Sequence, residues 1–481
     1  MVILAMIVIL AVILISRALL VRGRKLTQPT VKVSEQDAYV YGRKLQIMIQ
    51  CKTISRRNFY DDTEFAKLRE TVEDLFPLVH QHCQRMIFGD DCWIYKLPGR
   101  DAQRNIMLMS HHDVVDAQGS WQYPPFSGEM AEGKIWGRGT VDTKTPLFCE
   151  LMALEELLKE GFTPDCNVWI GSSCNEEIAG DGIPLANAYF KEQGIIFELI
   201  LDEGGAVIDP PISGMACKQC AMVAIHEKGR HKLILTASDE AGHAGLTAGM
   251  KATPTERMAA FITHFRKKNI FIRRLNPQVK AMFRGMAPYA AFPMRILFAN
   301  LWLFGPLLTA VLPKFSAQAG GLLGTTCAFH DIHSEENGKR CTARVMLRCV
   351  DDADLKTDLE NMKKLAARYG IVMTEGEDCE YHGPADPTLP GFGTVSQCIG
   401  TVFPDVPVIP FILPAGTDAR TLTDVCPCVL RFAPIRLSAQ QLASVHGENE
   451  NLDLTAIAEC VAFYRLLLTQ YDSKKENAAG A

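Results

Sequence analysis

The 481-residue chain lacks an excess of charge of either sign. It carries 50 Lys and Arg residues against 55 Asp and Glu residues, for a formal net charge of -5. The cations are dispersed along the chain and form no basic stripe, so a nucleic-acid-binding protein is disfavoured. With 48% hydrophobic residues, the composition also argues against wholesale disorder and a collagen-like structure. Because domains typically have about 100–200 residues, we expect two or three folding units.

The cysteines lack the even, dense spacing of a disulfide-rich secreted domain. All 16 are scattered through a large chain, which favours mostly buried, free thiols in a reducing compartment. Two close pairs, Cys217 with Cys220 and Cys426 with Cys428, could together form a structural zinc or redox site. No second CxxC motif or flanking His completes a known spacing, so this site is a minor alternative.

The N-terminal segment is apolar from residue 2 to residue 21, apart from Ser16 and Arg17. About 20 helical residues match a hydrocarbon core of about 30 Å. No basic region precedes the run and no clear cleavage site of small residues follows it, so we expect a membrane anchor rather than a signal peptide. Basic residues lie on its C-terminal flank: Arg17, Arg22, Arg24 and Lys25. The positive-inside rule therefore predicts a single-pass protein with a cytoplasmic main body, and the extracytoplasmic side is the alternative.

Past the anchor, apolar strand-like runs alternate with amphipathic helices. Three short buried runs cover residues 105–110, 167–173 and 197–201. Between the first two, leucines recur every three or four residues from 147 to 158, which indicates a helix. Strands separated by helices predict an α/β fold with a mainly parallel sheet.

Polar side chains follow each of the three predicted strands. His111 and Asp113 follow the first, Glu176 and Glu177 the second, and the acidic run that begins at Asp202 the third. Ligand sites in open α/β sheets lie beyond the carboxyl ends of the strands, so these clusters should collect at one edge. A further acid, Asp142, lies in a Gly-rich turn before the predicted helix, where glycines let the backbone turn tightly.

One His and several carboxylates crowded together would repel one another unless a cation lay among them. Imidazole and carboxylate ligands suit zinc, and two metals about 3.5–4 Å apart form a known hydrolytic arrangement. The sequence therefore predicts a metal site. The alternative is that each acid is a solvated loop end or a helix cap, which four clusters at successive strand ends make less plausible.

A series of ordered motifs spans residues 40 to 470. The motifs include His111-x-Asp113, Gly137-Arg138-Gly139-x-x-Asp142-x-Lys144, Glu176-Glu177, Asp202-Glu203-Gly204-Gly205, Glu227-Lys228-Gly229, Gly242-His243, Gly416-Thr417-Asp418-Ala419-Arg420 and His446-Gly447-x-Asn449-Glu450. They resemble the dizinc aminoacylase, carnosinase and glutamate carboxypeptidase family. The chain looks most similar to the branch that contains the N-fatty-acyl-amino-acid synthase/hydrolase.

The resemblance implies two zinc ions per chain. It places His111, Asp142 and Asp202 on one ion, and Asp142, Glu177 and His446 on the other, with Asp142 bridging both. The metal would lower the pKa of the water that attacks the substrate.

Four further roles follow from the same resemblance. Asp113 would orient His111, and Glu176 would be the general base that takes the proton of the attacking water. His243 would stabilise the oxyanion, often in the neighbouring subunit's site, and Arg420 would pair with a substrate carboxylate. The small Ser that usually follows this His is replaced by Ala244.

The resemblance also implies the domain organisation. We expect an anchor over residues 1–25 and a catalytic domain in two parts, 30–221 and 352–475. A smaller α+β lid over residues 222–351 would interrupt it and could form a homodimer. On this lid, residues 333–339 are polar where relatives have an Asn-Val-Ile-Pro segment.

The sequence as a whole predicts a membrane-anchored, zinc-dependent hydrolase that cleaves an amide bond of a small peptide or N-acyl amino acid. The alternative is a catalytically silent metal-binding scaffold or sensor. An apolar stretch over residues 286–312, which includes Trp302 and Phe304, suggests a surface that faces the membrane or the mouth of the active site and accepts an acyl chain. A buried lid helix or a dimer interface would explain the same stretch.

Overall fold

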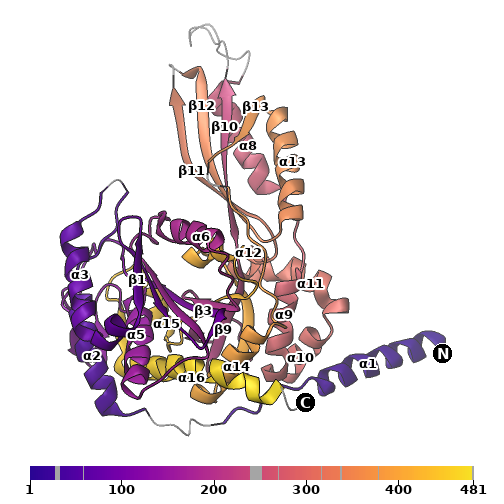
Figure 1. The fold of residues 1–481 in the computed structure, drawn as a ribbon. Helices are drawn as coiled ribbons and strands as arrows, with labels where there is room; N and C mark the ends of the chain where they lie inside the picture. Colours follow the sequence, from indigo (N-terminus) through magenta and orange to yellow (C-terminus); the bar gives the residue numbers. More distant parts are fainter. Residues whose placement is uncertain are drawn as a thin grey trace.

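The computed structural model describes residues 1–27, 33–57, 59–238, 252–268, 270–315, 317–335, 338–377 and 379–478. Figure 1 shows a catalytic body with helices on a central sheet, an elongated second domain that rises above it, and an N-terminal helix that projects from its lower edge. The predicted α/β fold with an inserted smaller domain is confirmed.

The catalytic body is built on a nine-stranded sheet. Its strands are β1 (Gln84–Phe88), β2 (Cys92–Leu97), β3 (Asp101–His111), β6 (Cys166–Ser173), β7 (Leu199–Asp202), β8 (Val207–Ile208), β9 (Cys220–Glu227), β14 (Val408–Leu413) and β15 (Val429–Arg431). The order is β1-β2-β6-β3-β7-β15-β9-β14, and β8 pairs with β9. The three predicted strands lie together, because β3 runs parallel to both β6 and β7, with Ile106 opposite Val168 and Leu199. Their carboxyl ends therefore meet at one edge.

Helices cover this sheet. They are α2 (Glu35–Ile49), α3 (Asp62–Leu75), α4 (Pro77–His82), α5 (Lys144–Lys159), α6 (Gly182–Glu192), α14 (Pro390–Val402), η3 (Asp418–Leu422), α15 (Ala439–Ala443) and α16 (Leu454–Ala478). The predicted helix over 147–158 is α5, which is buried along most of its length and packs against α16 and the sheet. Long apolar side chains such as Trp93 and Trp169 fill the core, and burial of this kind contributes about 25 cal/mol per Å².

A three-stranded sheet brings two distant turns together. Its strands are β4 (Glu129–Ala131), β5 (Lys134–Trp136) and β16 (Asn451–Asp453). Asn451 pairs with Trp136, so the end of β5 lies beside the start of β16. The Gly-rich turn that carries Asp142 follows β5, and the turn that carries His446 precedes β16. This pairing places both turns at the same end of the body.

The lid is a four-stranded antiparallel sheet with the order β11-β12-β10-β13. Its elements are β10 (Gly229–Ser238), α8 (Pro254–Lys267), β11 (Thr326–Glu335), β12 (Arg340–Cys349), α13 (Asp352–Arg368) and β13 (Ile371–Glu375). Both boundaries lie later in the chain than predicted. Residues 222–227 belong to β9 of the central sheet, and β13 pairs with β10 although it follows residue 351. Strand β9 is apolar on both faces, which suits a central sheet.

A helical segment within the predicted lid packs on the catalytic body instead. It comprises α9 (Pro277–Met286), η1 (Ala287–Tyr289), α10 (Phe292–Ala299), α11 (Leu301–Phe315) and α12 (Ala317–Gly321). Helix α9 lies against β14 at the edge of the central sheet, and Phe283 shares a core with Ile409 and Ile412. The apolar stretch over 286–312 is therefore part of the body, not of the lid sheet.

Helix α1 (Val2–Leu20) has the length and composition to cross a membrane, and a signal sequence would meet the same description. It packs against α10, and Ala18 is buried there. Beyond the helix, Arg24 donates hydrogen bonds to four backbone carbonyls of the body, the shortest to Val406 at 2.6 Å. All 16 cysteines are free thiols, and Cys217 and Cys220 lie 3.5 Å apart at Sγ.

Candidate functional site

The ends of three neighbouring strands and the two paired turns converge on Asp142. His111 Nε2 lies 3.0 Å from Asp142 Oδ1, and His446 Nε2 lies 2.9 Å from Asp142 Oδ2. His446 Nε2 also lies 3.0 Å from Glu177 Oε2. Two groups of possible metal ligands share Asp142: His111, Asp142 and Glu203 in one, and Asp142, Glu177 and His446 in the other. In each group the ligand atoms lie within 4.8 Å of one another, so Asp142 has the position of a bridging carboxylate.

The first group contains Glu203 where the sequence suggested Asp202. Both carboxylate oxygens of Asp202 accept backbone hydrogen bonds, from Glu203 N at 2.9 Å and Ala419 N at 3.0 Å. Strand β7 ends at Asp202 and the chain bends at Glu203, so the two acids have different surroundings. The structure groups Glu203 with His111 and Asp142, while Asp202 holds η3 against β7.

Asp113 lies behind the ligands and contacts three of the predicted residues. His111 Nδ1 lies 3.3 Å from Asp113 Oδ1 and 3.0 Å from the Asp113 carbonyl oxygen. The backbone N–H groups of Glu176 and Glu177 each donate to the Asp113 carboxylate at 3.2 Å. Burial disfavours a charged His111, but hydrogen bonds to Asp113 and Asp142 outweigh it and raise its pKa well above the ordinary value. Asp113 therefore fixes the His111 ring and the loop after β6 together.

The donor set fits divalent metal ions. Imidazole nitrogens and carboxylate oxygens are suitable ligands for zinc and similar ions. Glu177 Oε1 is buried and has no hydrogen-bond partner among the described residues. A buried carboxylate oxygen without a partner costs free energy, which a cation at this position would recover. The described site thus has the residues for a dinuclear metal centre.

Glu450 joins the two turns of the site, a role that the sequence did not reveal. Its buried carboxylate accepts hydrogen bonds from the backbone N–H groups of Val141, at 2.7 Å, and Asp142, at 3.1 Å. It also pairs with Arg138 at 2.7 Å, and Arg138 donates to the Gly447 carbonyl at 2.8 Å. His446 itself has a φ of 58°, a backbone conformation that residues other than glycine rarely adopt. Glu450 and Arg138 therefore position Asp142 and His446 and belong to neither group of candidate ligands.

A cavity of about 300 Å³ lies directly over the ligands. Asp142, Glu176, Glu177, Glu203 and His446 line one part of it. Its other wall is apolar and is formed by Leu413, Ala433, Ile435, Leu437, Leu442 and Val445. The ligand cluster is thus exposed to a space that has one polar and one apolar wall.

A second cavity of about 310 Å³ shares Glu176, Glu177 and His446 with the first. Four arginines line it: Arg57, Arg230, Arg348 and Arg420. Arg420 Nε donates to Glu380 at 2.9 Å, and Arg230 lies 3.5 Å from the same carboxylate. Burial and the charges of Arg230 and Arg420 lower the pKa of Arg348. A desolvated cation among cations favours an anionic ligand.

Arg230 and Arg348 are paired across β10 and β12 of the lid. The sequence identified Arg420 but not these two. Each lies on an ordinary alternating strand, so no local pattern distinguishes it from a solvated arginine.

A third cavity of about 280 Å³ is strongly apolar and adjoins the first. The two share Gly204, Gly205, Ala206, Leu413 and Leu442. Its far wall comes from the helical segment: Val279, Met282, Phe283, Leu312, Ala319 and Leu322. Trp302 and Phe304, for which the sequence suggested contact with an acyl chain, do not line it.

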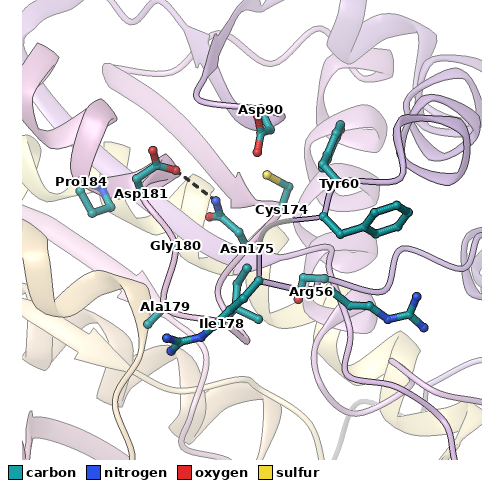
Figure 2. Close-up of a pocket in the computed structure, with 13 residues that line it drawn as sticks. Arg56, Tyr60, Asp90, Cys174, Asn175, Ile178, Ala179, Gly180, Asp181 and Pro184 are labelled. Carbon is teal, nitrogen blue, oxygen red and sulfur yellow. Dashed lines mark hydrogen bonds between the residues drawn. The ribbon is translucent and has the colours of Figure 1, made fainter.

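A larger cavity of about 660 Å³ lies on the other side of the loop after β6 (Figure 2). Asp181 and Asn175 meet there through a hydrogen bond of 3.2 Å. It shares Ile178 and Ala179 with the arginine-lined cavity, but none of the metal-ligand residues lines it. This cavity is therefore not the candidate active site, although it is larger than the cavities beside the ligands.

Comparison with known proteins decides the family. The profile described as "Peptidase family M20/M25/M40" matches residues 107–470, a region that holds every ligand described above. The chain belongs to this family. It is a metallopeptidase-type hydrolase.

The relatives of this M20 chain include proteins named as N-fatty-acyl-amino acid synthase/hydrolases and proteins named as carboxypeptidases. It is 30% identical over 424 residues to the N-fatty-acyl-amino acid synthase/hydrolase of Xenopus tropicalis. The matched region covers 85% of this chain and 81% of that protein. It is 28% identical over 417 residues to the probable carboxypeptidase S-like 2 of Dictyostelium discoideum, with 85% and 79% covered.

Solved M20-like structures share the fold. A metallo-carboxypeptidase of Sulfolobus solfataricus superposes with a TM-score of 0.66 at 17% identity, over 90% of this chain and 99% of that one. Human carnosine dipeptidase 1 superposes with a TM-score of 0.56 at 13% identity, over 90% of this chain and 98% of that one.

Within the M20 chain, His243 lies in residues 239–251, outside the described residues. Its role and a homodimer through the lid stay predictions.

Proposed function

We propose that this M20 peptidase is a dizinc hydrolase of N-acyl amino acids with an extended acyl chain. The observation that carries the proposal is the apolar cavity of about 280 Å³ that continues from the ligand cluster. An N-acyl amino acid has a carboxylate at one end and an acyl chain at the other. The arginine-lined and apolar cavities match these two ends. The name of the Xenopus relative agrees with this substrate class.

We assign the two zinc ions to the two ligand groups that share Asp142, with Glu203 in place of the expected Asp202. Bound ions of this kind lower the pKa of water and polarise a carbonyl group. Asp113 keeps the His111 ring in place, and Glu450 holds the two turns in register. A site that is held by such contacts needs little rearrangement on substrate binding.

Glu176 is the candidate proton acceptor. It lines both cavities that meet at the ligands, so it lies beside the bond to be cleaved when a substrate occupies both. Burial raises its pKa well above that of an ordinary carboxyl group. A raised pKa suits a carboxylate that takes a proton from water and passes it to the leaving amine. A silent scaffold would not require this second carboxylate beside Glu177.

Arg420 and Arg348 would bind the carboxylate of the amino-acid part. A guanidinium group makes two parallel hydrogen bonds to a carboxylate, and the two arginines approach from the body and from the lid. A small peptide with a free carboxyl terminus has the same group, and the carboxypeptidase name of the Dictyostelium relative favours it as the second candidate substrate.

For location, we propose that α1 anchors the enzyme in a membrane as a single span with a cytoplasmic catalytic body. Support comes from its length, from Arg17 in its last turn, and from Arg22 and Arg24, which follow it. Full-length protein should then resist carbonate extraction from membranes. Recovery of a trimmed chain in the medium would contradict an anchor.

A series of N-acyl amino acids tests the substrate class. On the purified full-length enzyme with zinc, kcat/KM should rise with acyl length, because each buried CH₂ contributes about 0.8 kcal/mol. Leu312→Trp fills part of the apolar cavity and should flatten the rise while acetyl-substrate hydrolysis persists. Glu176→Gln removes the proton acceptor and should lower turnover on every member about 10²-fold or more.

Leu303→Trp is the matched control, because Leu303 lies on the outer face of the same helix. An unchanged chain-length dependence in an active Leu312→Trp enzyme would disprove the acyl site. Faster hydrolysis of dipeptides than of every acyl substrate would favour the peptidase alternative.

A further inference from the structure

Helix α11 is apolar on both of its faces. Leu301 and Leu308 point into the protein core beside α9. On the other face Trp302 is 57% exposed, Leu303 38% and Leu307 54%, and Phe292 of the neighbouring α10 is 43% exposed. A helix on the surface of a water-soluble body normally presents polar residues to solvent, and exposed apolar clusters mark a contact surface.

The two helices form a bent hairpin and not a span. The axes of α10 and α11 meet at 105° with Asn300 between them. At about 1.5 Å per residue, 8 and 15 residues give lengths of about 12 and 22 Å, both shorter than a hydrocarbon core of about 30 Å. The Asn300 carbonyl accepts the N–H groups of Leu303 and Phe304 at 3.0 Å, so the corner leaves few backbone groups without partners. A hairpin of this size can lie within the interface of a bilayer.

The hairpin is joined to the helix that has the composition of a membrane span. Asn300 Nδ2 donates to the Leu14 carbonyl at 3.0 Å, and Arg17 Nε donates to the Ala299 carbonyl at 3.4 Å. Figure 1 shows α1 leaving the body next to α10, on the side of the molecule where α11 lies. A bilayer that contains α1 would therefore meet the outer face of the hairpin.

A basic groove of about 790 Å³ borders the same face. Its walls carry Arg273, Arg274, Lys280 and Arg284, together with Trp302 and Pro306. Arg274 is paired with Asp354 at 2.7 Å. No acidic residue is among the described residues that line the groove, so Lys280 and Arg284 make its surface positive. Cations near a membrane surface attract anionic headgroups, and Trp prefers the boundary between headgroups and acyl chains.

We propose that the α10–α11 hairpin is a second membrane contact, with Trp302, Leu303 and Leu307 in the outer acyl region and Lys280 and Arg284 against anionic headgroups. This contact does not depend on the substrate of the enzyme. Helix α9 would then have two functions, because Lys280 lines the groove while Val279 and Phe283 line the apolar cavity.

Fluorescence of Trp302 tests the proposal in the full-length protein reconstituted in vesicles. The chain has five tryptophans, and the other four, Trp93, Trp121, Trp136 and Trp169, lie in the catalytic body. Brominated phosphatidylcholine should quench part of the emission of the wild-type protein. Trp302→Phe should lose that quenched component and keep hydrolysis of an acetyl substrate. Adding Leu307→Trp to this variant should restore it.

Equal quenching in the wild-type protein and Trp302→Phe would overturn the proposal. Protection of Trp302 by a second copy of the chain would also overturn it, and would appear as unquenched emission together with a dimer in detergent. For the groove, phosphatidylglycerol in the vesicles should increase quenching. The double variant Lys280→Gln and Arg284→Gln should abolish that increase. If quenching in this variant increases as much as in the wild-type protein, the proposed headgroup contact is wrong.

Discussion

Asp202 and Glu203 are neighbours in the sequence but have different surroundings. Asp202 accepts two backbone N–H groups and links β7 to η3, whereas Glu203 lies with His111 and Asp142. A sequence pattern that ends a strand with two acids does not say which one faces the site. The answer depends on how the chain bends after Asp202, the last residue of β7.

The two acids should respond differently to removal of their charge. Glu203→Gln should lower the metal content from about two ions towards one per chain, while the free energy of unfolding of the metal-free protein changes little. Asp202→Asn should keep the metal but lower that free energy by about 1–3 kcal/mol, because its amide N–H₂ would face a backbone donor. Elemental analysis and urea unfolding separate the two effects. Loss of metal in Asp202→Asn alone would restore the ligand set expected from the sequence.

Among the larger elements, the two turns held by Glu450 connect distant parts of the chain. One turn follows β5 and the other precedes β16, and the Arg138–Glu450 pair is buried between them. Removing one partner of a buried ion pair leaves the other charge without compensation.

We therefore expect Glu450→Gln to lower the free energy of unfolding by about 3 kcal/mol and to weaken metal binding. Glu448→Gln, at an exposed position of the same turn, is the matched control and should change neither. Urea unfolding of the metal-free protein and zinc titration measure the two quantities. If metal binding were normal in a destabilised Glu450→Gln protein, the role of Glu450 in positioning the ligands would be wrong.

Elements with a strong local signal could be predicted, and those defined by distant contacts could not. The buried runs at 105–110, 167–173 and 197–201 became β3, β6 and β7, because continuous apolar stretches suit a central parallel sheet. The apolar stretch over 286–312 is predicted to lie in the lid, yet it shares a core with Ile409 and Ile412 of β14, which come much later in the chain. Nothing within that stretch specifies its partner.

Considered as one molecule, the enzyme has its site where the body and the lid meet. Among the described residues, the candidate metal ligands come only from the body, and their motifs made most of them recognisable in the sequence. The arginines proposed to bind the substrate carboxylate come from both domains. Arg230 and Arg348, on β10 and β12 of the lid, line one cavity with Arg420 of the body. The part of the site that depends on domain arrangement is therefore the part that the sequence could not show.

The neighbouring cavities around the ligand cluster also have a consequence for the order of events after cleavage. Hydrolysis of an N-acyl amino acid yields a fatty acid and an amino acid, which differ greatly in their solubility in water. The first would remain in the apolar cavity beside α9, and the second among the arginines. Departure of the amino acid alone would leave an acid bound near the ligands. The slowest step of turnover on long substrates would then be the escape of the fatty acid, and the reverse condensation would start from an enzyme that already holds it.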